Sequence, residues 1–332
     1  MRRVLTITFA AALLAVLCAS VTSRMPHGTA SAQSAQGQSH QPVETGEPDI
    51  IDHGMNPHGA KTGFLTAGGT GSLSPISYHN GQLIQTPTAY VIWYGNWNRG
   101  NGTDTPAGQQ IVRDFLSSVG GSPYYKINTT YSAGGYNVSG NVTRGTAEAS
   151  PGYSLGTRLT DANIQTIVKN AISAGSLPAD ANGVYFVLTS SDVSEQSGFC
   201  TRYCGWHTST SYTQTSNGRL RYSFVGNAAR CISSCAAQSV GPNGNAGVDG
   251  MISVVAHELE EANTDPDPAS GWVDSGGAEN ADKCAWTFGS RQFTASNGAV
   301  YNMTLGSRNY LIQRNLAATD NKCYIDWVNK IQ

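Results

Sequence analysis

A short run of charged residues, His257-Glu258-Leu259-Glu260-Glu261, constrains this chain more than any other feature. Apolar residues flank the run at helical spacing, so it is expected to lie on an α-helix, where residues four apart project side by side. The H-E-x-x-H pattern of metallopeptidases uses this spacing to hold zinc with two histidines, while the intervening glutamate is the general base. Here the carboxylate of Glu261 replaces the second imidazole, so the run predicts a metal-binding helix with one ligand changed.

Helical geometry indicates where each acid of the run points. A step of about 100° per residue places Met251, Val255 and Leu259 on one broad apolar arc. Glu260 points away from this arc and is expected to face solvent. Glu258 falls on the side expected to face the core, where a bare carboxylate is costly unless it is paired or near a cation. Glu258 is therefore the candidate general base; the alternative is a charged, salt-bridged helix end without a metal.

Further acidic residues follow the predicted helix. Residues 263–268 contain two prolines and are expected to end it. A glycine-rich loop then presents Asp274, Glu279 and Asp282. A third metal ligand often comes from such a downstream segment, with Glu279 as the first candidate and Asp282 as the second. These two are three residues apart, so one helical turn would point both the same way. Asp274 is expected to lie in a solvated turn.

The ligand set restricts the metal. One imidazole with two carboxylates is harder and more anionic than the two-His-one-Glu set of a zinc peptidase. Zinc is the first ion expected at His257, Glu261 and the third ligand, with manganese and calcium as alternatives. Two anionic ligands neutralise more of the ion's charge and acidify a bound water less, which is consistent with weak or absent catalysis.

The start of the 332-residue chain is typical of an exported protein. A positively charged start, an apolar run and a small-x-small cleavage signal predict a signal peptide over residues 1–32. Residues 33–75 are rich in Gly, Ser, Gln, Pro and His, which indicates a disordered leader. A single domain is expected over residues 76–332. The protein is therefore predicted to be secreted, with no membrane span after removal of the signal peptide.

Removal of the signal peptide leaves an even number of cysteines, which in an exported chain predicts three disulfides. A four-cysteine zinc site made from the two C-x3-C pairs is the alternative. Cys284 is expected to pair with Cys323, while the two C-x3-C pairs are bridged either locally or to each other. The six residues are Cys200, Cys204, Cys231, Cys235, Cys284 and Cys323.

The charge pattern excludes some partners. The formal net charge is −2, and the first 32 residues carry three arginines and no acids, so the mature chain is near −5. No basic stripe or Lys/Arg cluster is present, so nucleic acid and anionic membrane are not expected as partners. A peptide or a component of the cell surface or wall remains the candidate partner.

Hydrophobic periodicity predicts a mixed fold. Strands are expected at residues 89–94, 183–189 and 219–225, and an amphipathic helix at residues 105–119. A second helix is expected from Asp161, as its cap, to Ile172. These elements alternate without a regular βαβ rhythm, which indicates the α+β class.

Seven runs in order resemble the phosphate-induced protein 1, or EXORDIUM-like, family. They include VIWYGNW, GVYFVLTSSDV, GFCTRYCGWH, FVGNAARCISSC and VVAHELEEANTDP, and together they span about residues 78–325. The family is mainly known from plants as secreted, wall-associated proteins tied to growth responses, with bacterial relatives. The long leader and the DPDPASGWVD loop depart from the plant members, so the resemblance implies a bacterial member and leaves a plant growth role in doubt.

The resemblance also implies a zincin-like single domain and its site. The H-E-L-x-E helix followed by an acidic E-x-x-D segment resembles a zincin-like site, and it draws attention to His207 as a further ligand or transition-state stabiliser. The positions that carry this likeness are His257, Glu258, Glu261, Glu279 and Asp282.

Two functions follow from these patterns. The first is a secreted, peptidase-like metal-dependent hydrolase in which Glu258 accepts a proton from the attacking water. The second is a non-catalytic secreted protein that binds or signals at the cell surface or wall. In the second, the same cluster is a structural metal or ion-pair site.

Overall fold

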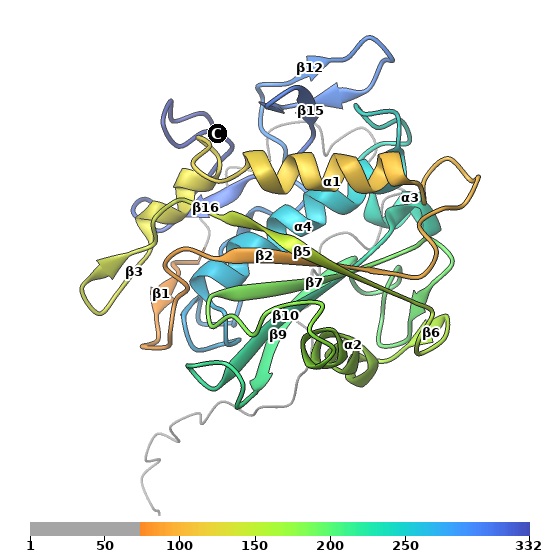
Figure 1. Ribbon diagram of the computed structural model, residues 1–332. Helices are drawn as coiled ribbons and strands as arrows, with labels where there is room; N and C mark the ends of the chain where they lie inside the picture. Colours follow the sequence, from red (N-terminus) through yellow and green to blue (C-terminus); the bar gives the residue numbers. More distant parts are fainter. Residues whose placement is uncertain (1–73) are drawn as a thin grey trace, which may run out of the picture. The chain divides into compact units, whose positions relative to one another are not determined.

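The computed structural model describes residues 74–332, so the predicted signal peptide, and the predicted leader up to residue 73, lie outside the described residues. A five-stranded sheet with the order β5-β2-β7-β10-β9 lies at the centre (Figure 1). The strands β5, β2, β7 and β10 are parallel, and the edge strand β9 is antiparallel to β10. The bounds are β2 Thr88–Tyr94, β5 Thr143–Gly152, β7 Gly183–Thr189, β9 Gly205–Ser211 and β10 Arg219–Gly226.

The three strands predicted from hydrophobic patterning are confirmed and form the middle of this sheet. Every residue of β7 is buried, as expected for a parallel strand that is covered on both faces. Its neighbours continue the apolar layer, since Val91 pairs with Phe186 and Phe224 pairs with Val187. The predicted mixture of helices and sheet is therefore confirmed, whereas the parallel order of four strands was not apparent from the sequence.

Three long helices pack on the sheet: α1 Pro106–Ser118, α2 Asp161–Ser173 and α4 Ala246–Thr264. The helices α1 and α4 contact each other on one face, and α2 packs on the other (Figure 1). Both predicted helices are thus present. The cap of α2 differs from the prediction: the Thr160 side chain accepts from the Asn163 backbone, and the Asn163 side chain accepts from the Thr160 backbone. Asp161, the predicted cap, is the first helical residue, because this reciprocal capping box satisfies two backbone donors.

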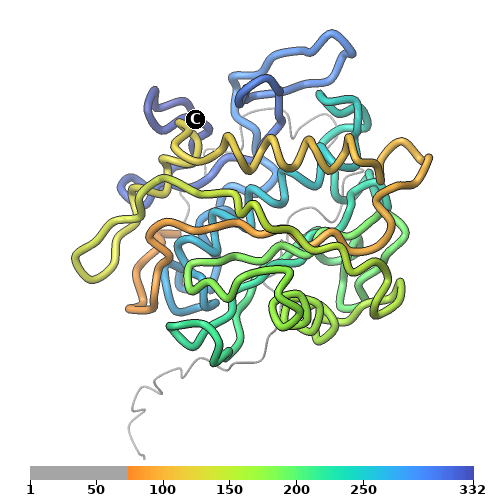
Figure 2. The backbone as a smooth tube through the Cα atoms, viewed as in Figure 1, coloured from red at the N-terminus to blue at the C-terminus, as the bar shows by residue number. Residues whose placement is uncertain are grey.

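Short elements surround the sheet and helices. The β16–β17 hairpin packs against η1 and η3, so the C-terminal segment returns to the end of α4 (Figures 1 and 2). No helix in residues 74–332 is both long and apolar enough to cross a bilayer. The remaining elements are β1 Ser77–Tyr78, η1 Tyr125–Thr130, β3 Ser132–Ala133, β4 Tyr136–Asn137, β6 Arg158–Leu159, β8 Ser194–Glu195, η2 Ala228–Arg230, α3 Ile232–Cys235, β11 Trp272–Val273, η3 Asp282–Cys284, β12 Phe293–Thr294, β13 Val300–Tyr301, β14 Met303–Leu305, β15 Arg308–Tyr310, β16 Asn315–Ala317 and β17 Lys322–Tyr324.

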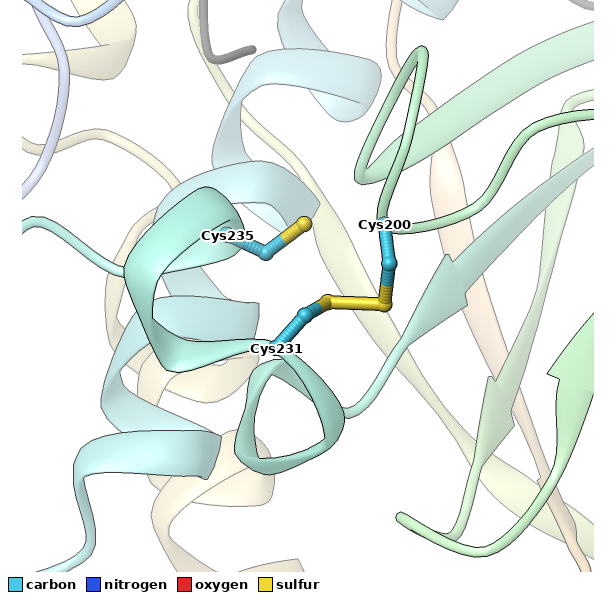
Figure 3. A group of neighbouring side chains, drawn as sticks. All are labelled: Cys200, Cys231 and Cys235. Carbon is cyan, nitrogen blue, oxygen red and sulfur yellow. A yellow bond between two sulfur atoms is a disulfide. The ribbon is translucent and has the colours of Figure 1, made fainter. Parts of the chain in front are cut away.

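All six cysteines of the described residues form disulfides. Cys284 pairs with Cys323, as predicted. The two C-x3-C pairs are bridged to each other, through Cys200–Cys231 and Cys204–Cys235. Figure 3 shows the bond between Cys200 and Cys231, with Cys235 on the neighbouring turn. These bonds exclude the alternative of a four-cysteine zinc site, because a disulfide sulfur is no longer a thiolate ligand.

Removal of the Cys284–Cys323 disulfide should destabilise the protein. The bond closes a segment of 39 residues, and loop-closure entropy predicts a loss of about 3–4 kcal/mol in the free energy of unfolding. The double variant Cys284→Ser, Cys323→Ser tests this by urea unfolding against the wild type. Wild-type protein unfolded in the presence of a thiol reductant is the control for general loss of disulfides. A change below about 1 kcal/mol would contradict the prediction.

Asp249, near the start of α4, should make stability depend on pH. Burial raises its pKa to about 6, although hydrogen bonds from Asn243 lower it. Because the folded pKa exceeds the unfolded value of 3.8, the proton stabilises the fold below about pH 4, and this stability is lost as the pH rises through 6. The free energy of unfolding of the wild type, relative to that of Asp249→Asn, should therefore rise by on the order of 2–3 kcal/mol when the pH falls from about 7 to about 4. Urea unfolding at both pH values measures this, and a constant difference would contradict it.

Candidate metal centre

The helix α4 is the structural base of the candidate site, and it confirms that the charged run lies on a helix, as predicted. Asn245 caps it by accepting from the Val248 backbone N–H at 3.2 Å, and the helix ends at Thr264, before Pro266 and Pro268. Residues 247–264 are all buried. The charged run therefore does not face water, because the sheet covers one side of α4 and η1 and the C-terminal segment cover the other.

The expectation that Glu260 faces solvent is also wrong. The side chain is fully buried, and its Oε2 accepts a hydrogen bond of 2.8 Å from Nδ2 of Asn315 on β16. Burial raises the pKa of Glu260 well above the usual 4.5, although Asn315 and His257 act against this. The helical projection assumed a single core-facing side, whereas β16 supplies a second covering layer from more than fifty residues downstream.

A network of buried asparagines joins α4 to η1 and the C-terminal segment. The Asn263 side-chain oxygen accepts from Tyr125 Oη at 3.1 Å and from Asn128 Nδ2 at 3.0 Å. The Asn128 oxygen in turn accepts from Nδ2 of Asn280 at 3.2 Å and of Asn315 at 3.1 Å. Sequence reasoning missed this network, since single asparagines spread over almost two hundred residues have no helical or strand spacing to connect them.

His257, Glu261 and Asp282 form the first group of potential ligands. Nε2 of His257 lies 2.8 Å from Oε1 of Glu261 and 3.5 Å from Oδ1 of Asp282. The Asp282 backbone N–H donates to the same Glu261 oxygen at 3.0 Å, which anchors η3 beside α4. The structure thus brings together the predicted pair on the helix and one acid from the downstream loop.

His207, Glu258 and Glu261 form the second group. His207 projects from β9 toward α4, and its Nδ1 lies 3.4 Å from Oε2 of Glu258 and 3.7 Å from Oε2 of Glu261. Gly205 allows the close approach of strand and helix, because a Cβ there would lie 2.6 Å from a methyl carbon of Val254. Glu258 is fully buried, as the helical projection predicted.

The two acids proposed as third ligand are separated. Asp282, the second candidate, lies beside His257, whereas Oε1 of Glu279, the first candidate, lies 3.7 Å from Nε2 of His207. Asp274 is buried and forms an ion pair with Lys283, so its expected solvated turn is wrong. The loop therefore places Glu279 and Asp282 against different histidines, which a shared helical turn would not do.

The electrostatics of the first group favour a cation. Burial disfavours the charged form of His257, but the carboxylates of Glu261, Asp282 and Glu258 outweigh burial and hold its pKa well above 6.5. The site thus attracts a proton to a ring that is 1% exposed. A metal cation provides the same positive charge once it displaces that proton.

The donor atoms of each group are close enough to share one ion. Within each group they all lie within 4.8 Å of one another. Zinc lies about 2.0–2.2 Å from nitrogen and carboxylate ligands, so two ligands of one ion are separated by up to about 4 Å. The residues therefore fit a divalent metal after small side-chain adjustments.

The fold and the site together define a class of protein: a disulfide-bonded mixed domain whose buried central helix contributes imidazole and carboxylate groups to a common cluster. Residues 76–325 match the model of the phosphate-induced protein 1 conserved region, and this range includes both ligand groups. The chain belongs to the phosphate-induced protein 1 family, which confirms the family predicted from the sequence.

Named relatives come from plants. Protein EXORDIUM-like 3 of Arabidopsis thaliana is 31% identical over 283 residues, which cover 74% of this chain and 81% of the relative. Protein EXORDIUM-like 5 of the same plant is 30% identical over 285 residues, or 74% and 76% of the two chains. Protein PHOSPHATE-INDUCED 1 of Nicotiana tabacum is 28% identical over 218 residues, or 58% and 65%. No solved structure matches the chain.

Proposed function

We propose that this protein is a secreted metal-binding protein that acts at the cell surface or wall without catalysis. One observation carries the proposal: an imidazole and two carboxylates, from His257, Glu261 and Asp282, converge in the interior with their donor atoms within 4.8 Å. Asp282 is the most exposed of the three at 8%. Such burial favours a structural ion, because a hydrolytic site must admit a substrate carbonyl.

The cellular location and source are part of the proposal. Three disulfides support export, since such bonds persist in oxidising compartments. The predicted signal peptide at residues 1–32 supports an extracellular partner, such as a peptide or a wall component. A bacterial source remains a proposal from the leader and the DPDPASGWVD loop, and the named relatives are from plants.

The donor types indicate which ion binds. Zinc and manganese accept mixed imidazole and carboxylate ligands, whereas calcium takes oxygen ligands. Each of the two groups contains a histidine, His207 or His257. We therefore expect zinc first and manganese second, and calcium fits less well.

Elemental analysis of the purified protein tests the proposal. The wild type should retain at least one divalent ion per chain after dialysis, and His257→Ala should lose the ion held by the first group. His79→Ala is the matched control, because His79 is exposed and outside both groups. A wild-type protein that neither retains nor takes up zinc or manganese would overturn the proposal.

A zincin-like metal-dependent hydrolase is the second candidate function. Glu258 favours it, because this fully buried carboxylate lies one residue from His257 and 3.4 Å from Nδ1 of His207. A bound ion would supply Lewis acidity, and Glu258 would accept a proton from the attacking water. His207 would stabilise negative charge that develops during the reaction.

Glu258→Gln tests this candidate. The variant should lower cleavage of a peptide library by about 100-fold or more, since a general base contributes on that scale. Under this candidate its metal content should equal that of the wild type. Metal-dependent cleavage by the wild type would count against the non-catalytic function, whereas a metal-loaded wild type without any cleavage would exclude the hydrolase.

A further inference from the structure

The orientation of His207 fixes which of its nitrogens can bind a ligand. Nε2 lies 3.1 Å from the backbone carbonyl oxygen of Asp265. A carbonyl oxygen only accepts, so Nε2 carries the hydrogen and donates. In the neutral ring, Nδ1 then has a lone pair. Metal-binding histidines are typically oriented in this way, with the nitrogen opposite the metal donating to a backbone carbonyl or a carboxylate.

The lone-pair side of His207 faces two carboxylates. Nδ1 lies 3.4 Å from Oε2 of Glu258 and 3.7 Å from Oε2 of Glu261, and these three donor atoms form a group within 4.8 Å. His207 is 1% exposed, and both glutamates are fully buried. Three acceptor atoms gathered this closely in the interior are stabilised by a cation between them.

Glu261 belongs to both ligand groups through different oxygen atoms. Its Oε1 lies 2.8 Å from Nε2 of His257, and its Oε2 lies 3.7 Å from Nδ1 of His207. A carboxylate that directs one oxygen to each of two ligand groups is suited to bridge two metal ions. Two-metal sites in proteins have ions about 3.5–4 Å apart, a separation that one carboxylate spans.

The charge of the buried acids matches two divalent ions. The two groups together contain three carboxylates, those of Glu258, Glu261 and Asp282, and Glu279 adds a fourth 3.7 Å from His207. Carboxylates that bind a metal are deprotonated, so four of them would carry four negative charges, which two divalent cations would balance. Buried charges require this kind of compensation because the interior has a low dielectric constant.

We propose that His207, Glu258 and Glu261 bind a second divalent ion, so that Glu261 bridges a two-ion centre. The inference rests on the proposed function, because the first ion at His257, Glu261 and Asp282 defines the other half of the centre. In this arrangement Glu258 is a ligand of the second ion and does not act as a general base.

Counting ions in two histidine variants tests the proposal. The full chain is stripped with a chelator, reloaded with zinc alone, and analysed by native mass spectrometry and by elemental analysis. The wild type should bind two zinc ions per chain, and His207→Ala and His257→Ala should each bind one. In the contrary outcome, the wild type binds a single ion, which His257→Ala loses and His207→Ala keeps. That result would overturn the second site and leave the proposed function intact. A wild type that binds neither zinc nor, when reloaded with it, manganese would overturn both.

Glu258→Gln provides a test that keeps His207 in place, should His207→Ala fail to fold. The variant should bind one zinc ion and have the circular dichroism spectrum of the wild type. Two ions in folded Glu258→Gln would remove Glu258 from the ligand set and overturn the proposed site.

Manganese tests the bridge directly. Two manganese ions joined by one carboxylate are magnetically coupled, so the electron paramagnetic resonance spectrum of the loaded wild type should be broadened. The spectrum of His207→Ala loaded with one ion should be that of an isolated ion. A wild-type spectrum of two uncoupled ions would overturn the bridging role of Glu261.

Discussion

The Glu261→Gln variant is expected to lose metal binding. One oxygen of Glu261 lies 2.8 Å from His257 and the other 3.7 Å from His207, so the residue belongs to both ligand groups. Loss of an orienting partner alone weakens metal affinity about 10–100-fold, so loss of a shared ligand should exceed that range. Elemental analysis after dialysis should find less than about a tenth of the wild-type metal.

Glu260→Gln is the matched control for this change. It makes the same carboxylate-to-amide substitution at the adjacent, equally buried position, which belongs to neither ligand group. Its metal content should equal that of the wild type. Bound metal stabilises the folded state by mass action, so Glu261→Gln should also melt on the order of 10 °C lower in excess zinc. Equal metal contents in the two variants would contradict the assignment of Glu261.

Asn263→Ala should strongly destabilise the fold although the residue lies outside both ligand groups. Asn263 accepts hydrogen bonds from Tyr125 and Asn128, and its Nδ2 donates to the carbonyl oxygen of Ile84. The alanine variant leaves these three buried groups without that partner, and each lost partner costs about 1–3 kcal/mol. The free energy of unfolding should fall by about 3 kcal/mol or more, with a melting temperature lower by roughly 10 °C.

Thermal and urea unfolding of Asn263→Ala should be compared with Asn98→Ala. Asn98 is exposed, and an exposed substitution should change stability by less than about 0.5 kcal/mol. Since Asn263 belongs to neither ligand group, the variant should bind as much metal per folded chain as the wild type. A loss below about 1 kcal/mol would show that the asparagine network contributes little to the fold.

Local patterns were sufficient to predict the main elements. The strand at Gly183–Thr189 and the helix that contains the charged run were predicted from apolar spacing, because both elements bury a continuous apolar surface. The inward direction of Glu258 followed from the same helical geometry. The pairing of Cys284 with Cys323 was also predicted correctly.

Features that depend on distant segments could not be predicted in this way. Glu260 was expected in solvent, since helical projection cannot reveal that Asn315 covers the opposite side of α4. His207 was noticed through the family resemblance, but its place opposite Glu258 depends on β9 being the antiparallel edge strand beside α4. The separation of Glu279 from Asp282 arises from the loop conformation, which residue spacing alone does not determine.

The Cys284–Cys323 disulfide can form only after the candidate ligand residues have been synthesised. Asp282 begins η3, and Cys284, two residues later, is its last residue. Its partner Cys323 lies downstream of every proposed ligand in the chain. During synthesis, the segment that holds Asp282 against α4 can therefore be cross-linked only after all ligands have emerged. Under the proposed function, metal loading of the mature site is therefore expected to follow oxidative folding in the compartment where the disulfide forms.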